Sequence, residues 1–132
     1  MEKKINKYIY WTPRILSIIF ICFLALFSLD VISPELSFWQ IVVGLFMHNI
    51  PVFILLAVLI ISWKREIVGG VAFILAGILY IVMILMNMLK NSFEWYMVSW
   101  ILTIAGPAFI IGILFIVNWR KRQNNQKNTP IK

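Results

Sequence analysis

His48 is the only histidine in the chain, and it stands inside a long run without Asp, Glu, Lys or Arg. An imidazole there could handle protons or a substrate, or it could tie two helices together as a neutral hydrogen-bonding group. Other polar residues occupy the same half of their own apolar runs, which predicts a polar crevice open to the outer side of a membrane. Its candidate members are Asp30, His48, Asn49, Asn87, Ser99 and Thr103. Asp30 and His48 differ in depth, so we expect a water bridge between them.

Enzymatic chemistry finds little support in the sequence. The single cysteine, Cys22, cannot form an intramolecular disulfide, and no Cys/His/carboxylate cluster has metal-ligand spacing. The motifs of zinc proteases, serine hydrolases and phosphate-binding loops are absent. We therefore expect no catalytic residue, no metal and no cofactor, and we expect that the protein is not an enzyme.

Two prolines lie inside the apolar runs. Pro51 and Pro107 each lack the N–H that would bond the carbonyl four residues earlier, which belongs to Met47 or Thr103 respectively. We expect helix kinks at both positions. Such kinks serve shape and packing, or they form a hinge or a ligand notch.

Composition narrows the class of protein. The 132 residues are 62% hydrophobic and 13% charged, whereas soluble domains average roughly 45–50% and about 25%. An ordinary cytosolic enzyme, a disordered chain and a coiled coil are excluded. The net charge of +7 comes from residues beside the apolar runs, which is typical of a membrane protein rather than of a nucleic-acid-binding surface.

The runs free of charged residues are 15–29, 36–63, 67–89 and 95–119. Each of the last three exceeds the roughly 20 residues that cross a bilayer as a helix. We predict an all-α, transmembrane four-helix bundle, with one membrane domain over 1–120 and spans near 11–31, 38–63, 67–89 and 96–118. The first run is short, so we expect Arg14 to snorkel to the surface. A cleaved signal peptide is the alternative for this run, but no small-residue cleavage site follows it.

The flanking residues predict the orientation. All but one of the 12 Lys and Arg residues fall on one side, the exception being Lys90. The positive-inside rule then places both termini in the cytoplasm. Glu66 begins the third span, and we expect its negative charge to stabilise the N-terminus of that helix. The basic polar tail, 121–132, is expected to be disordered or to lie on anionic headgroups.

A partial internal repeat is visible. A shift of 56 residues places Trp39 on Trp95, Pro51 on Pro107 and Trp63 on Trp119. The shift would relate two helical hairpins as parallel repeats. The alternative is that unrelated spans share interfacial tryptophans and flanking cations, although this does not explain the paired prolines.

Small residues predict where helices approach closely. On the fourth span they lie on the side away from Pro107, and we expect this side to form a homodimer contact. The residues concerned are Ala105, Ala108 and Gly112.

Three short motifs carry a family resemblance: His48-Asn49-Ile50-Pro51, the string WKRE (63–66) followed by Gly69-Gly70, and Leu114-Phe115 ahead of Asn118-Trp119. From about Trp11 to Trp119 the chain resembles a family of small prokaryotic four-span membrane proteins of unknown function. The resemblance implies a fold and a place in the cell membrane, but no activity. Our leading hypothesis is an interaction or assembly protein in the lipid bilayer. The alternative is a small transporter or channel with an outward-facing crevice around His48.

Overall fold

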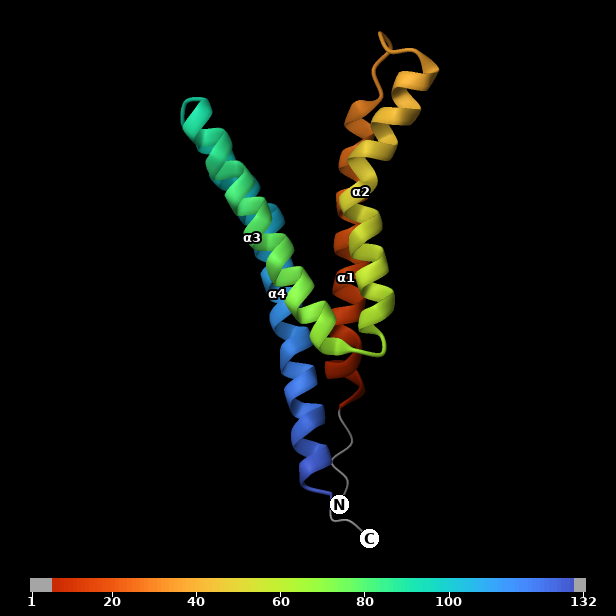
Figure 1. Ribbon diagram of the computed structural model, residues 1–132, viewed down its shortest axis with the longest axis vertical. Coiled ribbons are helices and arrows are strands. Elements are labelled where there is room, and N and C mark those ends of the chain that lie inside the picture. Colours follow the sequence, from red (N-terminus) through yellow and green to blue (C-terminus); the bar gives the residue numbers. More distant parts are fainter. Residues whose placement is uncertain (1–5, 130–132) are drawn as a thin grey trace.

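Helices account for the regular structure throughout residues 6–129, which are the residues that the computed structural model describes. They are α1 (Lys7–Phe27), the 3₁₀ helix η1 (Ser28–Val31), α2 (Phe38–Ser62), α3 (Glu66–Lys90) and α4 (Trp95–Lys127) (Figure 1). The four α-helices are long and apolar enough to cross a membrane. No strand occurs within 6–129. The predicted all-α class is therefore confirmed, whereas the exact membrane boundaries stay predictions. Lys3, Lys4 and Lys132, which contribute to the orientation argument, lie outside the described residues.

The helix ends follow from local sequence. Ser37 caps the start of α2. The backbone N–H of Gln40 donates to the side chain of Ser37, and the backbone N–H of Ser37 donates to the side chain of Gln40. This capping box satisfies two N–H groups that the start of a helix leaves without a partner. At α1 the side chain of Asn6 accepts from the backbone N–H of Tyr8 at 3.3 Å. Pro34 stands in the connection between η1 and α2, where a proline's fixed backbone suits a turn.

The expectation of disorder is wrong for residues 121–127 of the basic tail, whereas contact of the tail with anionic headgroups stays a prediction. These residues continue α4 as an unbroken helix to Lys127. Arg, Lys and Gln are good helix formers, and neither Gly nor Pro interrupts the segment before Pro130. The basic tail is thus an extension of α4, and residues 130–132 of the predicted tail lie outside the described residues.

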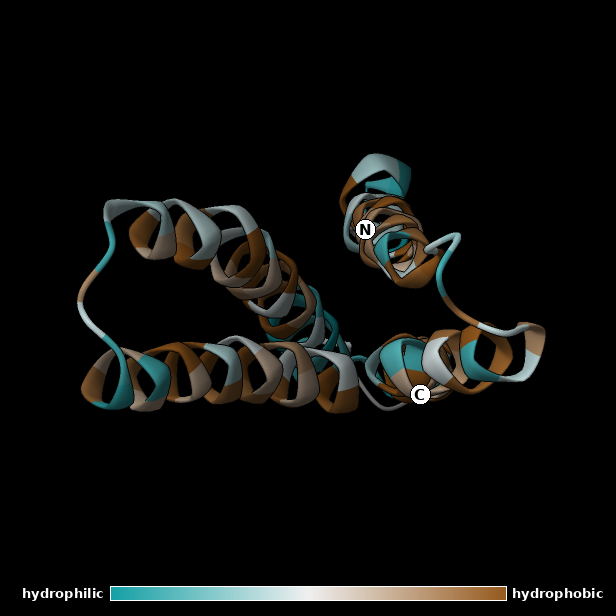
Figure 2. Cartoon of the chain, turned by 90° about the horizontal axis from the view of Figure 1, so that it is seen from above, coloured by the Kyte–Doolittle hydropathy of each residue, from teal (hydrophilic) through white to brown (hydrophobic). Residues whose placement is uncertain are grey.

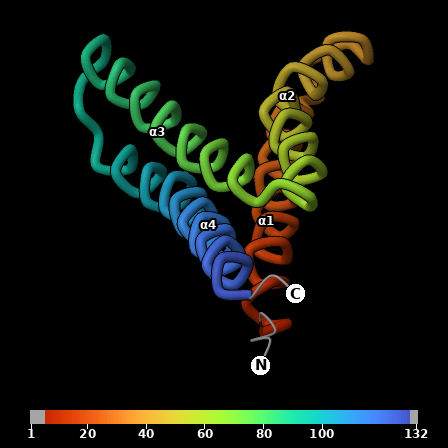
Figure 3. The backbone as a smooth tube through the Cα atoms, turned by 60° about the horizontal axis from the view of Figure 1, so that its bottom comes forward, coloured from red at the N-terminus to blue at the C-terminus, as the bar shows by residue number. Residues whose placement is uncertain are grey.

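The molecule has the shape of a V. One arm consists of α1 and α2, the other of α3 and α4, and the arms meet where the short connection 63–65 joins α2 to α3 (Figure 1). We call this the junction end; α1 begins and α4 ends on this side of the molecule. Toward the connections 32–37 and 91–94 the arms diverge, as the tube view also shows (Figure 3). Seen from above, apolar residues occur on every helix, as expected for surfaces in contact with hydrocarbon (Figure 2).

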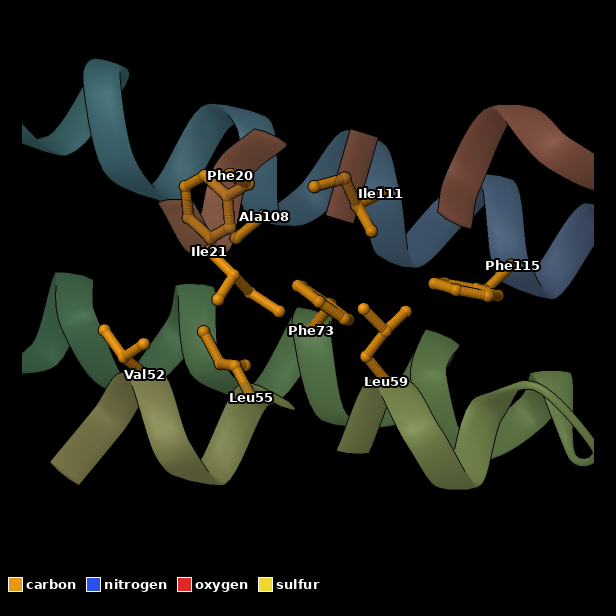
Figure 4. Packing of buried hydrophobic residues seen from close by; sticks show 9 residues of the cluster. All are labelled: Phe20, Ile21, Val52, Leu55, Leu59, Phe73, Ala108, Ile111 and Phe115. Carbon is orange, nitrogen blue, oxygen red and sulfur yellow. The ribbon is translucent and has the colours of Figure 1, made fainter. Parts of the chain in front are cut away.

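The apolar core lies where the arms meet and draws on all four helices (Figure 4). At its centre Phe73 of α3 is 0% exposed, and its ring stacks on that of Phe115 of α4, with centroids 6.1 Å apart. Phe20 and Ile21 reach it from α1, and the remaining members are Val52, Leu55, Leu59, Ala108 and Ile111. Core packing is therefore concentrated near the junction end.

Two glycines allow α3 and α4 to pack closely. A Cβ atom added to Gly112 would lie 2.9 Å from the carbonyl oxygen of Gly70, and one added to Gly70 would lie 3.1 Å from that of Gly112. Each backbone therefore occupies the space that a side chain would need. Because hydrocarbon gives no hydrophobic force between helices, such close contact stabilises the pair by van der Waals packing. These two helices share the most extensive interface in the described part of the chain.

Candidate functional site

The largest fully buried side chain in the described region is a charged one, that of Arg14 near the junction end of α1. The side chain of Arg14 is 0% exposed and that of Glu66, the first residue of α3, is 2% exposed. Nη2 of Arg14 donates to Oε1 of Glu66 at 3.1 Å. From α4, Nη2 of Arg122 lies 3.4 Å from the same oxygen. One carboxylate thus joins three helices.

The guanidinium of Arg14 is held on several sides. Nη1 donates to the carbonyl of Tyr10, and Nη2 also donates to the carbonyl of Trp63, which follows α2, at 3.4 Å. Its Cζ atom lies over the Tyr10 ring, 3.6 Å from the ring centroid, where the ring face attracts a cation. The expectation that Arg14 snorkels to the surface is therefore wrong. A buried carboxylate and an aromatic ring replace water as its partners.

This cluster, consisting of Arg14, Glu66 and Arg122, carries two positive charges and one negative. Within residues 6–129, Nε of Arg14 and Oε2 of Glu66 are buried without a hydrogen-bond partner. Removing one partner of a buried pair costs about 3–5 kcal/mol, because the other charge stays buried and uncompensated. The arrangement is suited to locking helices together, and it presents no nucleophile beside a general base.

A second polar contact ties α1 to α4 at the same end. Pro13 lacks an N–H, so the carbonyl of Ile9 loses its normal helical partner. Asn118, which is 2% exposed, fills this place by donating from Nδ2 to that carbonyl at 2.7 Å. Ser17 in turn donates to the carbonyl of Pro13. The junction end is therefore held by directional bonds in addition to apolar packing.

The members of the predicted crevice lie toward the diverging ends of the arms. All are exposed except Asn49, which is partly buried. Their hydrogen bonds within 6–129 are local. Asn49 donates to the carbonyl of Leu45, Thr103 donates to that of Ser99, and Asn87 accepts from Asn91, the residue that directly follows α3. His48 has no such bond in this part of the chain. Apart from the bond of Thr103 to Ser99 within α4, no hydrogen bond in the described part of the chain joins two crevice residues, and the crevice stays a prediction.

The residues expected to form a dimer contact are buried inside the chain. Ala105 is 1% and Ala108 is 2% exposed, and Gly112 packs on Gly70 and Ile74 of α3. A homodimer through this face stays a prediction, but it would require α4 to leave α3. The helices continue as α-helix through both expected kink positions, Pro51 and Pro107.

Sequence reasoning missed the Arg14–Glu66–Arg122 cluster. It treated Glu66 as a helix-terminal charge and each arginine as part of the cationic flank. A signal was present, because Glu66 directly follows Lys64 and Arg65, and Glu2 is the only other acidic residue on the cation-rich side of the predicted spans. A lone acid at the edge of an apolar run can reach a buried cation on a neighbouring helix.

A protein-family model described as "Domain of unknown function (DUF7670)" matches residues 1–127. The chain belongs to this family. No curated protein and no solved structure matches it. Membership of the DUF7670 family agrees with the resemblance to an uncharacterised family, whereas the prokaryotic source and the short motifs stay predictions. The DUF7670 match covers every residue of the cluster.

Proposed function

We propose that this protein is a multi-pass protein of a prokaryotic cell membrane, with both termini cytoplasmic, that acts as an interaction or assembly protein. Four long apolar helices support the membrane location, and the cations flanking their junction ends support the orientation. The matched prolines and tryptophans of α2 and α4 support the hypothesis that the two arms are parallel repeats of one helical hairpin. The proposal assigns the chain no catalytic step.

The observation that carries the proposal is the exposure of His48. It lies nine residues inside α2 from Trp39, about 14 Å at the rise of an α-helix, and it has no hydrogen-bond partner within 6–129. An imidazole facing hydrocarbon alone is costly, so polar groups at this depth pair across helices. A membrane-spanning helix of another protein that carries a hydrogen-bonding side chain would supply what this chain lacks.

The surroundings of His48 suit such a helix. A hollow of about 500 Å³ on the same part of α2 is lined by Trp39, Gln40, Val43, Gly44 and Met47. Gly44 lies one helical turn from His48, and the side chain of Val31 already fills the space that a Cβ atom there would occupy. The exposed side chains of Trp39, Val43 and Met47 therefore form the surface on which a partner helix would dock. A transporter would need a polar cavity that reaches His48. This hollow has a mainly apolar lining. A second cavity, which lies between α1 and α4, has a mainly apolar lining as well. Both linings favour the docking of a partner helix over transport.

Photo-crosslinking in intact membranes tests the proposal. A photoreactive amino acid at Met47, which lines the hollow, is expected to give one discrete crosslinked species, whereas the same probe at Val42, exposed on a different face of α2, is expected to give none. His48→Leu should abolish the Met47 product and His48→Asn should retain it, because only Asn keeps a hydrogen-bonding group. Equal crosslinking in both variants, or a product whose mass corresponds to lipid alone, would overturn the proposal.

A further inference from the structure

We propose that the two arms of the V close on the side of α2 and α3, and that Asn87 of α3 then donates a hydrogen bond to the imidazole of His48. The structure shows the open arrangement: within residues 6–129, His48 has no hydrogen-bond partner and the side chain of Asn87 has only Asn91. Closure would occupy the imidazole that a partner helix needs. This regulatory role rests on the docking function proposed for His48, whereas the closure itself does not.

His48 and Asn87 lie on the faces of their helices that meet in the core. Along α2, Leu55 and Leu59 follow His48 after seven and eleven residues, or about two and three helical turns, so the three side chains share one face. Along α3, Asn87 follows Phe73 after fourteen residues, or about four turns. Leu55, Leu59 and Phe73 belong to one buried cluster (Figure 4). Both polar residues therefore continue the core-facing sides of α2 and α3 toward the diverging ends.

The two residues lie at similar heights above the junction end. Ser62 of α2 and Gly69 of α3 face each other there, since a Cβ atom added to Gly69 would lie 2.9 Å from that of Ser62. From these positions His48 is about 21 Å along α2 and Asn87 about 27 Å along α3, at the rise of an α-helix. Side chains tilt toward the N-terminus of their helix, so the imidazole points toward the diverging ends, the amide points toward the junction end, and the difference shrinks. Tyr80, on the same face of α3, starts lower and points lower still, which leaves Asn87 as the partner.

The other two helices already touch across the arms at this height. The ring of Phe27 in α1 lies with its centroid 5.3 Å from that of Trp100 in α4. Trp100 is about 18 Å beyond Gly112 toward the diverging ends, and Gly112 packs on Gly70 near the junction end, so Trp100 and His48 stand at nearly the same height. The arms can therefore approach on the side of α2 and α3 by turning about the core and this ring contact.

The hydrogen-bonding groups of the pair are complementary. A neutral imidazole has one acceptor nitrogen, and Nδ2 of Asn87 keeps its N–H donors, because Oδ1 is the atom that accepts from Asn91 at 2.7 Å. Each group is costly when it is left alone in hydrocarbon, so polar side chains at such depths pair across helices. A partner helix that binds His48 would have to displace Asn87 first, which makes the pair a built-in restraint on docking.

Distances between spin labels in lipid nanodiscs test the closure. In a full-length Cys22→Ala chain, labels at Ser33→Cys and Ser92→Cys report the separation of the diverging ends by double electron–electron resonance. We expect a population with shorter distances beside the open one. Asn87→Leu and His48→Leu should each lower the ratio of closed to open molecules by about three- to tenfold, the range for one hydrogen bond between membrane helices.

Two further variants make the distance test specific. The double variant Asn87→Leu with His48→Leu should lower the ratio no further than either single variant, because both remove the same bond. Thr103→Val is the control, since the hydroxyl of Thr103 donates to the carbonyl of Ser99 within α4, and it should leave the distances unchanged. A single long-distance population, equal distances in all variants, or losses that add in the double variant would each overturn the closure.

Photo-crosslinking from Met47 tests the regulatory role separately. Asn87→Leu should raise the yield of the crosslinked product, because it frees the imidazole for the partner helix, whereas Thr103→Val should not. A yield that Asn87→Leu leaves unchanged would overturn the restraint on docking. The absence of any product in the natural chain and in Asn87→Leu would overturn the docking function and with it the regulation, but not the closure, which the distances decide.

Discussion

Asn118 donates from Nδ2 to the carbonyl of Ile9 at 2.7 Å, across the interface of α4 with α1. This carbonyl is the one that Pro13 deprives of its helical N–H donor. A buried carbonyl without a donor is costly where water is absent. The bond therefore repairs a defect in one helix with a side chain of another, and it fixes the register of the two helices at the junction end.

Asn118→Leu should destabilise the fold by about 1–3 kcal/mol, because the Ile9 carbonyl would remain buried without a donor. Thermal unfolding in detergent, followed by tryptophan fluorescence, measures this change. Asn124→Leu, at an exposed position on the same helix, is expected to have little effect. Equal melting temperatures for the Asn118 variant and the natural chain would show that the bond contributes nothing.

Glu66→Gln should destabilise the protein by about 3–5 kcal/mol, because Arg14 would stay buried without its counter-charge. The double variant Arg14→Met with Glu66→Met is expected to recover much of this loss, since no uncompensated buried charge remains. Arg122→Gln should cost less, because this side chain is 38% exposed and solvent screens its charge. Unfolding measurements in one detergent compare the three. Additive losses in the double variant would contradict the pairing.

Gly112→Ala should lower the melting temperature, because the added methyl group would lie 2.9 Å from the carbonyl oxygen of Gly70. Gly106→Ala provides a matched control on the same helix: a Cβ atom there meets nothing within 4 Å, and alanine favours a helix over glycine by about 1 kcal/mol. We expect the second variant to be as stable as the natural chain or more so. The opposite order would contradict the packing of α3 on α4.

Cysteine labelling checks the orientation. In a Cys22→Ala background, Ser33→Cys and Ser92→Cys lie in the connections between helices at the diverging ends, and a membrane-impermeant maleimide added to whole cells should label both. Lys64→Cys, in the connection at the junction end, should react only after the membrane is opened. Labelling of Lys64→Cys in intact cells would reverse the proposed orientation.

The helical architecture could be predicted because it depends on composition along the chain. Runs without charge predict helices of membrane length, and α2 indeed spans the run that contains His48. The Arg14–Glu66 pair could not be predicted in the same way, since it depends on how helices rotate and pack. The charged residues that flank the apolar runs place Arg14 and Glu66 at the edge of the membrane. Their burial follows only from the contact that they make with each other in the folded chain.

The small-residue face of α4 shows the same limit. Ala105, Ala108 and Gly112 correctly indicate close helix packing, but sequence spacing does not say whether the partner is another copy or another helix of the same chain. In the structure α3 contacts Gly112 directly. The proposed docking face at His48 follows instead from exposure, which is a property of the assembled helices.

The V shape has a mechanical consequence. Because the arms are joined at one end and diverge toward the other (Figure 1), the molecule occupies a larger cross-section in one lipid monolayer than in the opposite one. A protein of this wedge shape lowers the elastic energy of a bilayer that is convex on the side of the diverging ends. With the orientation proposed above, the protein would concentrate at outwardly convex regions of the cell surface.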